Sequence, residues 1–113
     1  MIHRLAHGLS SQFAGRPVAV SSPQGRFADQ AAALDGSVLA GAEAWGKHLF
    51  IHFGGGDRPD PRIVHIHLGL IGTLRFEPLA PPHGQVRLRI ADAEVAADLR
   101  GPQRCVLIDP PAE

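Results

Sequence analysis

The sequence is poor in cysteine and contains no long apolar run. Cys105 is the only cysteine in 113 residues, which excludes an internal disulfide framework and any zinc finger built from a cysteine cluster. It lies in the apolar segment "CVLI", so we predict that it is a small buried hydrophobic residue. No stretch reaches the roughly 18 apolar residues of a membrane span, and no signal-peptide pattern is present. We therefore expect a cytoplasmic protein.

Net charge is also lacking. Eleven basic and eleven acidic residues give a formal net charge of zero and a pI of about 7.1. Overall charge thus does not indicate a nucleic-acid-binding protein, and such a function must depend on a local patch of arginine side chains. With 44% hydrophobic and 19% charged residues, the chain has a globular composition, and its length is enough for one domain.

Lysine is nearly absent, because the only one is Lys47, in the segment "AWGKHLFIHF". One interpretation is a solvated residue at the start of a strand. The other is an ammonium group that contacts a phosphate or attacks an electrophilic carbon. Strand alternation over 47–53 places Lys47 on the same side as Leu49, Ile51 and Phe53. Because a lysine inside a core is very costly, we expect Lys47 to project from the open end of the strand.

Short segments with the period of a β-strand dominate the remaining sequence. Helical spacing predicts one helix over 2–13 and a second, short helix over 27–36. The predicted strands cover residues 17–21, 37–44, 47–53, 62–67, 71–77, 85–90, 93–98 and 104–108, and "GGGDRPDPR" and "EPLAPPHG" are the longer loops. This pattern predicts a mainly β domain of eight antiparallel strands, a sandwich or a barrel, with two short helices.

Seven histidines include two pairs that share a strand face, His48 with His52 and His65 with His67. Two imidazoles on one face can bind the same metal ion. However, the sequence offers few carboxylate partners, and solvent-exposed histidines on the polar face of a sheet explain His48, His52 and His65 adequately. We therefore predict no metal site.

The segment "HLGLIG", residues 67–72, predicts a tight turn. Gly69 and Gly72 bracket an apolar pair, Leu70 and Ile71. The turn either holds a large apolar side chain outward or is an ordinary hairpin whose leucine folds back into the core.

Five segments together resemble one known family. "IHRLA", "SSPQGRF", "GKHLF", "HLGL-x-G" and "ADLRG" occur in the order and spacing of the N-terminal domain of the formamidopyrimidine-DNA glycosylase and endonuclease VIII family, and the bacterial endonuclease VIII-like branch is the most similar. The resemblance spans nearly the whole chain. It implies a β-sandwich of eight strands flanked by helices. It also implies base excision repair, in which an oxidised base is flipped out of DNA and removed, and the abasic site is nicked by a lyase step.

The resemblance implies roles for four residues. The lysine of "GK" contacts the phosphate of the flipped nucleotide and assists acid–base chemistry, which maps to Lys47. The histidine of "HLG" maps to a phosphate contact at His67, and the apolar residue that fills the gap left by the flipped base maps to Leu70. The arginine that reaches the orphaned base maps to Arg100. Arg26 is a further cation that we expect on the same DNA-binding surface.

Three departures from the family pattern limit these expectations. The family starts with Pro-Glu-Gly, whose proline amine forms a Schiff base with deoxyribose and whose glutamate is the acid/base, whereas Met1 here directly precedes Ile2. Gly101 and Pro102 replace the aromatic wedge, and the sequence stops before the helix–two-turns–helix domain and zinc finger. We therefore expect residues 1–113 to form the N-terminal β-sandwich domain, without a cofactor, and to bind damaged double-stranded DNA weakly when alone.

Two hypotheses of different classes follow. In the first, the chain is the N-terminal catalytic domain of a DNA glycosylase and abasic-site lyase, inactive as given. In the second, it is a non-catalytic β-sandwich that binds DNA or a protein partner. The neutral charge favours the second and the five matching segments favour the first, which we prefer. An in-frame Met-Pro-Glu-Gly in the coding DNA upstream of Met1 would distinguish them.

We predict that the 113-residue chain neither excises a base nor nicks DNA, because the amine that forms the Schiff base is missing from it. Borohydride trapping on abasic-site DNA tests this prediction, since reduction converts a Schiff base into a stable crosslink. We expect no crosslink. A crosslink that maps to Lys47 would contradict the prediction and show that this amine replaces the proline.

Overall fold

The structure, a computed structural model, describes residues 2–55 and 58–108. Its helices are α1 (Ile2–Phe13) and α2 (Ala28–Leu34). One sheet has the order β1 (Arg16–Pro17), β3 (Val38–Trp45), β4 (His48–Gly55), β5 (Arg58–His67) and β9 (Arg104–Ile108). The other has the order β2 (Ala19–Ser21), β7 (Val86–Ala91), β8 (Val95–Arg100) and β6 (Thr73–Pro78). All pairings are antiparallel, which confirms the mainly β prediction.

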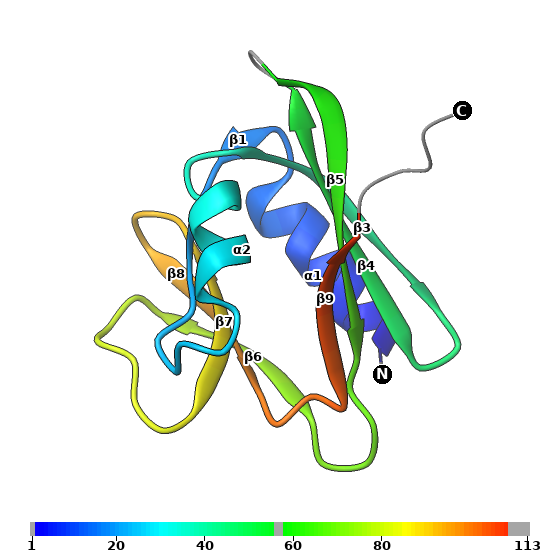
Figure 1. The fold of residues 1–113 in the computed structure, drawn as a ribbon, viewed down its shortest axis with the longest axis vertical. Coiled ribbons are helices and arrows are strands. Elements are labelled where there is room, and N and C mark those ends of the chain that lie inside the picture. Colours follow the sequence, from blue (N-terminus) through cyan, green and yellow to red (C-terminus); the bar gives the residue numbers. More distant parts are fainter. Residues whose placement is uncertain (1, 56–57, 109–113) are drawn as a thin grey trace.

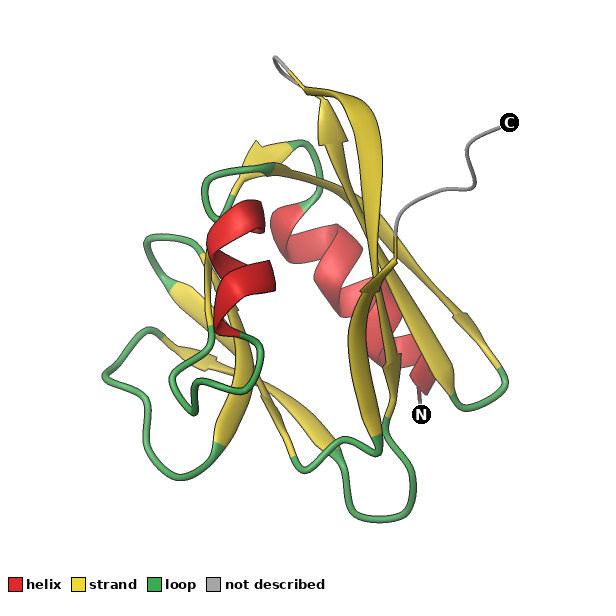
Figure 2. Ribbon diagram, viewed as in Figure 1, coloured by secondary structure: helices red, strands yellow, loops and turns green. Residues whose placement is uncertain are grey.

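Both sheets and both helices contribute to one hydrophobic core. The five-stranded sheet lies on the right of Figure 1 and the four-stranded sheet on the lower left, with α2 visible between them. Figure 2 shows that strands, and not helices, make up most of the regular secondary structure. Alternate residues along the strands point inward, so that Ile51 and Ile66 of one sheet and Leu88 and Leu99 of the other are almost fully buried. The arrangement is a two-layer β-sandwich.

The two predicted helices are confirmed. Helix α1 buries Ala6, Leu9 and Phe13, which lie on one face at helical spacing. The ring of Phe13 stacks on Phe76 of β6 with centroids 6.5 Å apart, so that α1 is tied to the second sheet as well as to β3. Gly15 follows with a φ of +82°, a conformation that glycine adopts at little cost. Neither helix of the described residues is long and apolar enough to cross a membrane.

The strand predicted over 17–21 is wrong, because the segment forms two strands in different sheets. β1 pairs with β3, and β2 pairs with β7. Val18 lies between them, is buried, and exchanges backbone hydrogen bonds with the α2–β3 turn: its N–H donates to Ser37 and its carbonyl accepts from Gly36. The described residues therefore contain nine strands rather than eight. Local alternation could not reveal the change of sheet, because the two pairing partners are far away in sequence.

The long loop predicted over 54–62 is also wrong, because β4 and β5 continue into it. Gly55 pairs with Arg58 at the end of this extended hairpin. The prolines at 59 and 61 led us to expect a loop. The described pairing of β5 with β9 begins at Ile63, after both prolines.

Cys105 of β9 lies opposite Ile66 of β5 and packs against the core, although it is partly buried and not fully buried as predicted. Burial raises the pKa of its thiol to about 12, with a small opposing effect of Arg87. The thiol is therefore protonated at neutral pH and behaves as a small hydrophobic group.

Candidate nucleic-acid interface

Turns from both sheets meet at one end of the sandwich, which we call the loop end. It comprises the β3–β4 turn (46–47), the β5–β6 loop (68–72), the β8–β9 loop (101–103) and the β2–α2 loop (22–27). In Figure 1 it occupies the lower half of the molecule, from the β2–α2 loop on the left to the β3–β4 turn on the right. Backbone hydrogen bonds fix two of these loops to neighbouring strands: the N–H of Gln103 donates to the carbonyl of His67 in β5 at 2.8 Å, and that of Gln24 donates to the carbonyl of Val86 in β7 at 2.9 Å. Every residue predicted to contact DNA lies in or beside these segments.

Lys47 is exposed in the two-residue turn between β3 and β4, next to Gly46, whose φ is +58°. The strand predicted to begin at Lys47 begins one residue later, at His48, which pairs with Trp45 across the turn. Lys47 therefore projects from the end of the strand, as the cost of burying an ammonium group requires. Its placement fits both a solvated residue and a phosphate contact.

The β5–β6 loop points its apolar residues outward. Leu70 is 96% exposed and Ile71 is 82% exposed. The loop is closed by the N–H of Gly72, which donates to the carbonyl of Leu68 at 3.0 Å. The outward interpretation of this segment is confirmed, and a leucine folded back into the core is excluded. The loop and the β8–β9 loop enclose a shallow hollow of about 310 Å³ between Leu70 and Pro102.

His67 is the last residue of β5 and is half-buried. Its ring stacks on His48, with centroids 4.5 Å apart and an interplanar angle of 23°. His48 in turn contacts His65, with 2.8 Å between Nδ1 of His48 and Nε2 of His65. In this contact one ring nitrogen donates a hydrogen bond and the other accepts it. Burial, and next the charge of His48, lowers the pKa of His65, with smaller contributions from Arg104 and His67.

The histidine pairs do not meet as the sequence analysis grouped them. His52 contacts Glu43 at 3.1 Å, away from the cluster of His48, His65 and His67. Within the described residues, no group of three or more histidine, cysteine, aspartate or glutamate side chains is arranged to hold a metal ion. That the chain binds no metal stays a prediction.

Arg100 ends β8 and is fixed by two contacts. Its Nη2 donates to the carbonyl of His83 at 3.0 Å and lies 3.8 Å from Oδ2 of Asp98. Asp98 is 1% exposed, and Arg89 donates to both of its oxygens, at 2.7 and 3.0 Å. This fork raises the pKa of Arg89. Asp98 is thus the anchor of a buried ion pair beside the loop end.

Arg26 is exposed in the β2–α2 loop, next to Gly25, whose φ is +97°. The loop is held on the first residue of β7, because Gln24 donates to the carbonyl of Val86. Val86 pairs with Arg100, which also pairs with Thr73 just after the β5–β6 loop. Arg26 and Arg100 therefore belong to the same end of the four-stranded sheet.

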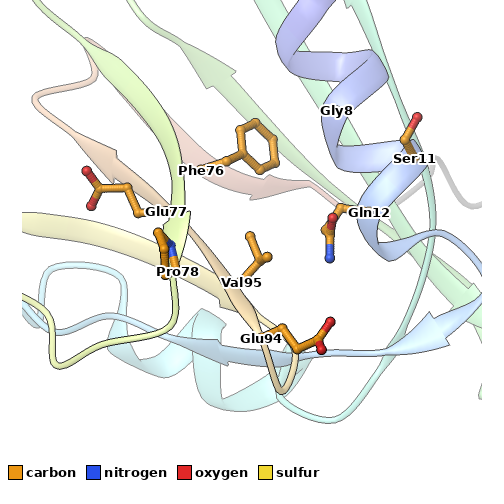
Figure 3. Close-up of a pocket in the computed structure, with 8 residues that line it drawn as sticks. All are labelled: Gly8, Ser11, Gln12, Phe76, Glu77, Pro78, Glu94 and Val95. Atoms are coloured by element: carbon orange, nitrogen blue, oxygen red, sulfur yellow. The ribbon is translucent and has the colours of Figure 1, made fainter.

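A larger groove, of about 490 Å³, lies elsewhere, between α1 and the edge strand β6. Figure 3 shows the ring of Phe76 directed toward the helix, with Glu77 and Glu94 beside the groove. Its lining consists of Gly8, Ser11, Gln12, Phe76, Glu77, Pro78, Glu94 and Val95. Two carboxylates and no basic residue line it, so it does not suit a nucleic-acid phosphate.

Sequence reasoning missed two residues. Trp45 is 67% exposed, two positions before Lys47, and we had assigned it no role. Asp98 received no role of its own, although it follows three apolar residues in the strand "VAADLR", and an aspartate buried in a strand is typical of an ion pair. The signals in the sequence were a large aromatic residue at a strand end for Trp45 and a charged residue among apolar strand residues for Asp98.

Comparison with known proteins decides the family. Residues 2–105 match the family model described as the formamidopyrimidine-DNA glycosylase N-terminal domain. The chain belongs to this family. The proteins named "Endonuclease 8 1" from Mycobacterium bovis and Mycobacterium tuberculosis are each 54% identical to this family member, over 96% of its length. The chain spans 41% of the length of these relatives.

Solved structures confirm the fold. The Lactococcus lactis Fpg (MutM) protein, crystallised with DNA containing N7-benzyl-Fapy-dG, matches 96% of this chain with a TM-score of 0.74. A complex of the same protein with abasic-site DNA matches 93% with a TM-score of 0.72. Sequence identity is 19% in both cases, and the match covers 42% and 41% of those chains. The family member described here therefore has the fold of the N-terminal part of these proteins.

Proposed function

We propose that this chain is the DNA-contacting N-terminal domain of a DNA glycosylase and abasic-site lyase that removes oxidised bases in base excision repair. The observation that carries the proposal is the composition of the loop end, where the only lysine and two outward apolar residues stand on adjoining turns. The mycobacterial relatives named Endonuclease 8 1 and the Fpg structures with damaged DNA support it.

We infer that residues 1–113 act as one domain, because both sheets and both helices share a single buried cluster. The proposed DNA contacts use side chains alone, so we propose no cofactor for this domain. Genomic DNA as the substrate would place the protein in the bacterial cytoplasm.

Lys47 is the proposed contact to the phosphate of the flipped nucleotide. A compact, strongly hydrated ammonium on a flexible stem both neutralises a phosphate and can give up a proton, which a guanidinium cannot do. The short turn that holds Lys47 fixes its backbone beside His67, because His67 pairs directly with His48. We propose that His67 binds the neighbouring stretch of the DNA backbone.

Leu70 is the proposed residue that fills the gap left by the flipped nucleotide. An apolar side chain that is 96% exposed gains free energy when it enters a base stack and leaves water. The closed turn from Leu68 to Gly72 holds it in this outward position before DNA binds. A rigid, preorganised wedge loses little conformational freedom on insertion.

Arg100 and Arg26 are the proposed contacts on the side of the four-stranded sheet. The contacts to His83 and Asp98 fix the orientation of the Arg100 guanidinium, which has five N–H donors and keeps others for a base edge. Arg26 is exposed in its loop, and such a cation suits a phosphate contact.

We predict that the isolated chain binds a labelled abasic-site duplex with a dissociation constant of about 10⁻⁴ to 10⁻⁶ M at physiological salt, because few cations converge on the loop end. Lys47→Ala should make the slope of log K against log salt shallower by about one unit, as expected for one lost phosphate contact. The measurement is fluorescence anisotropy at several salt concentrations.

Arg16→Gln is the matched control for charge, because Arg16 is exposed in β1 at the opposite end of β3. Leu70→Ala should change the affinity little, since a plug acts only after a base is flipped. Equal salt slopes for Lys47→Ala and Arg16→Gln would refute the loop-end assignment. Nanomolar binding that Leu70→Ala abolishes would show that this domain flips nucleotides unaided, and binding of a protein but not of DNA would favour the non-catalytic alternative.

A further inference from the structure

Four residues form a continuous row across the five-stranded sheet. Trp45 of β3 pairs with His48 of β4, His48 pairs with His67 of β5, and His67 pairs with Arg104 of β9. Residues directly opposite each other in antiparallel strands point to the same face. Their neighbours Ala44, Leu49, Ile66 and Cys105 pack against the core. The row therefore lies on the outer face of the sheet, and we call it the aromatic row.

The aromatic row is made of flat rings with a cation at each end. Trp45 is 67% exposed at the end next to Lys47, and Arg104 is exposed at the other end. Between them the two imidazoles stack at 4.5 Å, and the next row repeats the motif, with Phe50 on His65 at 4.7 Å and 8°. These stacks fix the ring planes before any ligand binds.

Charge on this face is complementary to an anion. Arg104 carries a permanent positive charge on this face, and Lys47 adds another in the adjoining β3–β4 turn. Glu43 supplies a carboxylate among the described residues of the outer face, and Nε2 of His52 lies 3.1 Å from its Oε1. A row of rings lined by cations is the arrangement by which proteins bind single strands, with bases stacked on rings and phosphates on basic side chains.

We propose that the aromatic row binds single-stranded nucleic acid, with an unpaired base stacked on Trp45 and the backbone held by His67 and Arg104. A duplex cannot use this site fully, because its bases present their faces to one another and not to a protein ring. The row spans three strand-to-strand distances, roughly 14 Å, enough for a short stretch of a single strand. The site shares His67 with the proposed duplex contacts and lies next to Lys47, but its stacking residue, Trp45, is not among those contacts.

Two measurements on the 113-residue chain test the proposal. Trp45 is the only tryptophan, so its intrinsic fluorescence reports directly on stacking. We expect an oligothymidylate of about ten nucleotides, a length within the usual site size, to quench this fluorescence. We expect Trp45→Ala to weaken binding of the labelled oligonucleotide about tenfold in anisotropy, and Trp45→Phe to retain most of the affinity because a ring remains. Arg104→Gln should make the salt slope shallower by about 0.7 unit.

Matched controls come from the other parts of the fold. Leu79→Ala removes a 47% exposed apolar residue beyond β6, and Arg16→Gln removes a cation from β1; neither should alter binding. An oligouridylate bound as tightly as the oligothymidylate would identify the ligand as single strands in general, and weaker binding would identify it as DNA. No quenching, or equal losses for Trp45→Ala and Leu79→Ala, would overturn the proposal. If the proposal fails in this way, duplex binding that depends on Lys47 would still support the proposed function. If single strands bind in a Trp45-dependent manner but duplex binding does not depend on Lys47, the proposed function is refuted and the aromatic row is not.

Discussion

Replacing Asp98 with alanine is expected to lower the free energy of unfolding by about 3–5 kcal/mol, the usual effect of removing one partner of a buried ion pair. Asp98 is 1% exposed, and both of its oxygens accept hydrogen bonds from Arg89. The substitution leaves the largely buried guanidinium of Arg89 without its anion. Chemical denaturation followed by circular dichroism measures the loss.

The same substitution should also loosen the loop that covers this part of the sheet. Arg89 donates to the carbonyl of Ala80 at 2.6 Å, and Arg100 donates to that of His83 at 3.0 Å, so two arginines that contact Asp98 hold the β6–β7 loop. Asp98 is therefore a positioning residue for Arg100. If it acts in this way, hydrogen exchange within residues 79–85 should accelerate in Asp98→Ala below the unfolding transition.

Asp29→Ala is the matched control, because it removes an exposed aspartate from the first turn of α2. Its cost should stay within about 0.5 kcal/mol, as is usual for a surface position. Asp98→Asn keeps the shape of the side chain and should fall between the two. Equal stability of Asp98→Ala and Asp29→Ala would contradict the role given to the buried pair.

Features encoded by neighbouring residues were predictable from the sequence. Helix α1 follows from apolar residues at helical spacing and a glycine after Phe13, and the alternation over Leu49, Ile51 and Phe53 predicted which face of β4 is buried. The tight turn around Leu70 followed from its two glycines, whereas the sequence alone left open whether the leucine points outward, as it does. In each case a few consecutive residues determine the local structure.

Features that depend on pairing between distant strands were not predictable. The change of sheet at Val18 requires knowledge that β1 pairs with β3 and β2 with β7. The aromatic row depends on the register of four strands, and a shift of one residue would turn His48 into the core. The fork between Asp98 and Arg89 joins neighbouring strands in the same way. Single-sequence patterns specify faces, whereas register decides which side chains meet.

The charged side chains of this neutral chain are distributed unevenly over the fold. Among the described acidic residues, Glu77 and Glu94 lie beside the groove in Figure 3, away from the loop end. Lys47 lies at the loop end, and Arg104 lies at the end of the aromatic row that is farther from Lys47. Opposite charges thus lie on different parts of a chain whose net charge is zero, so net charge alone does not exclude a local cationic surface.

Gly72→Ala is expected to cost about 1–3 kcal/mol of folding free energy, in the range of overpacking in a site that cannot relax. A Cβ at Gly72 would lie 2.3 Å from the carbonyl oxygen of Leu68 and 2.9 Å from its carbonyl carbon. Both are backbone atoms, so no side chain can rotate away. The turn must open, and the hydrogen bond from Gly72 to Leu68, now 3.0 Å long, must be lost.

Gly41→Ala is the matched control, because the nearest atom to its added Cβ would be Oγ of Ser10 at 3.8 Å, an ordinary contact. Neither glycine has a positive φ, so the two substitutions differ in space and not in backbone preference. Denaturation of both variants, with hydrogen exchange at the amide of residue 72, separates a local opening from global destabilisation. If the amide at 72 stays protected in Gly72→Ala and the two variants are equally stable, the closed turn does not hold Leu70 outward. Loss of protection confined to the loop would show that close backbone packing at Gly72 keeps the turn that carries Leu70 closed.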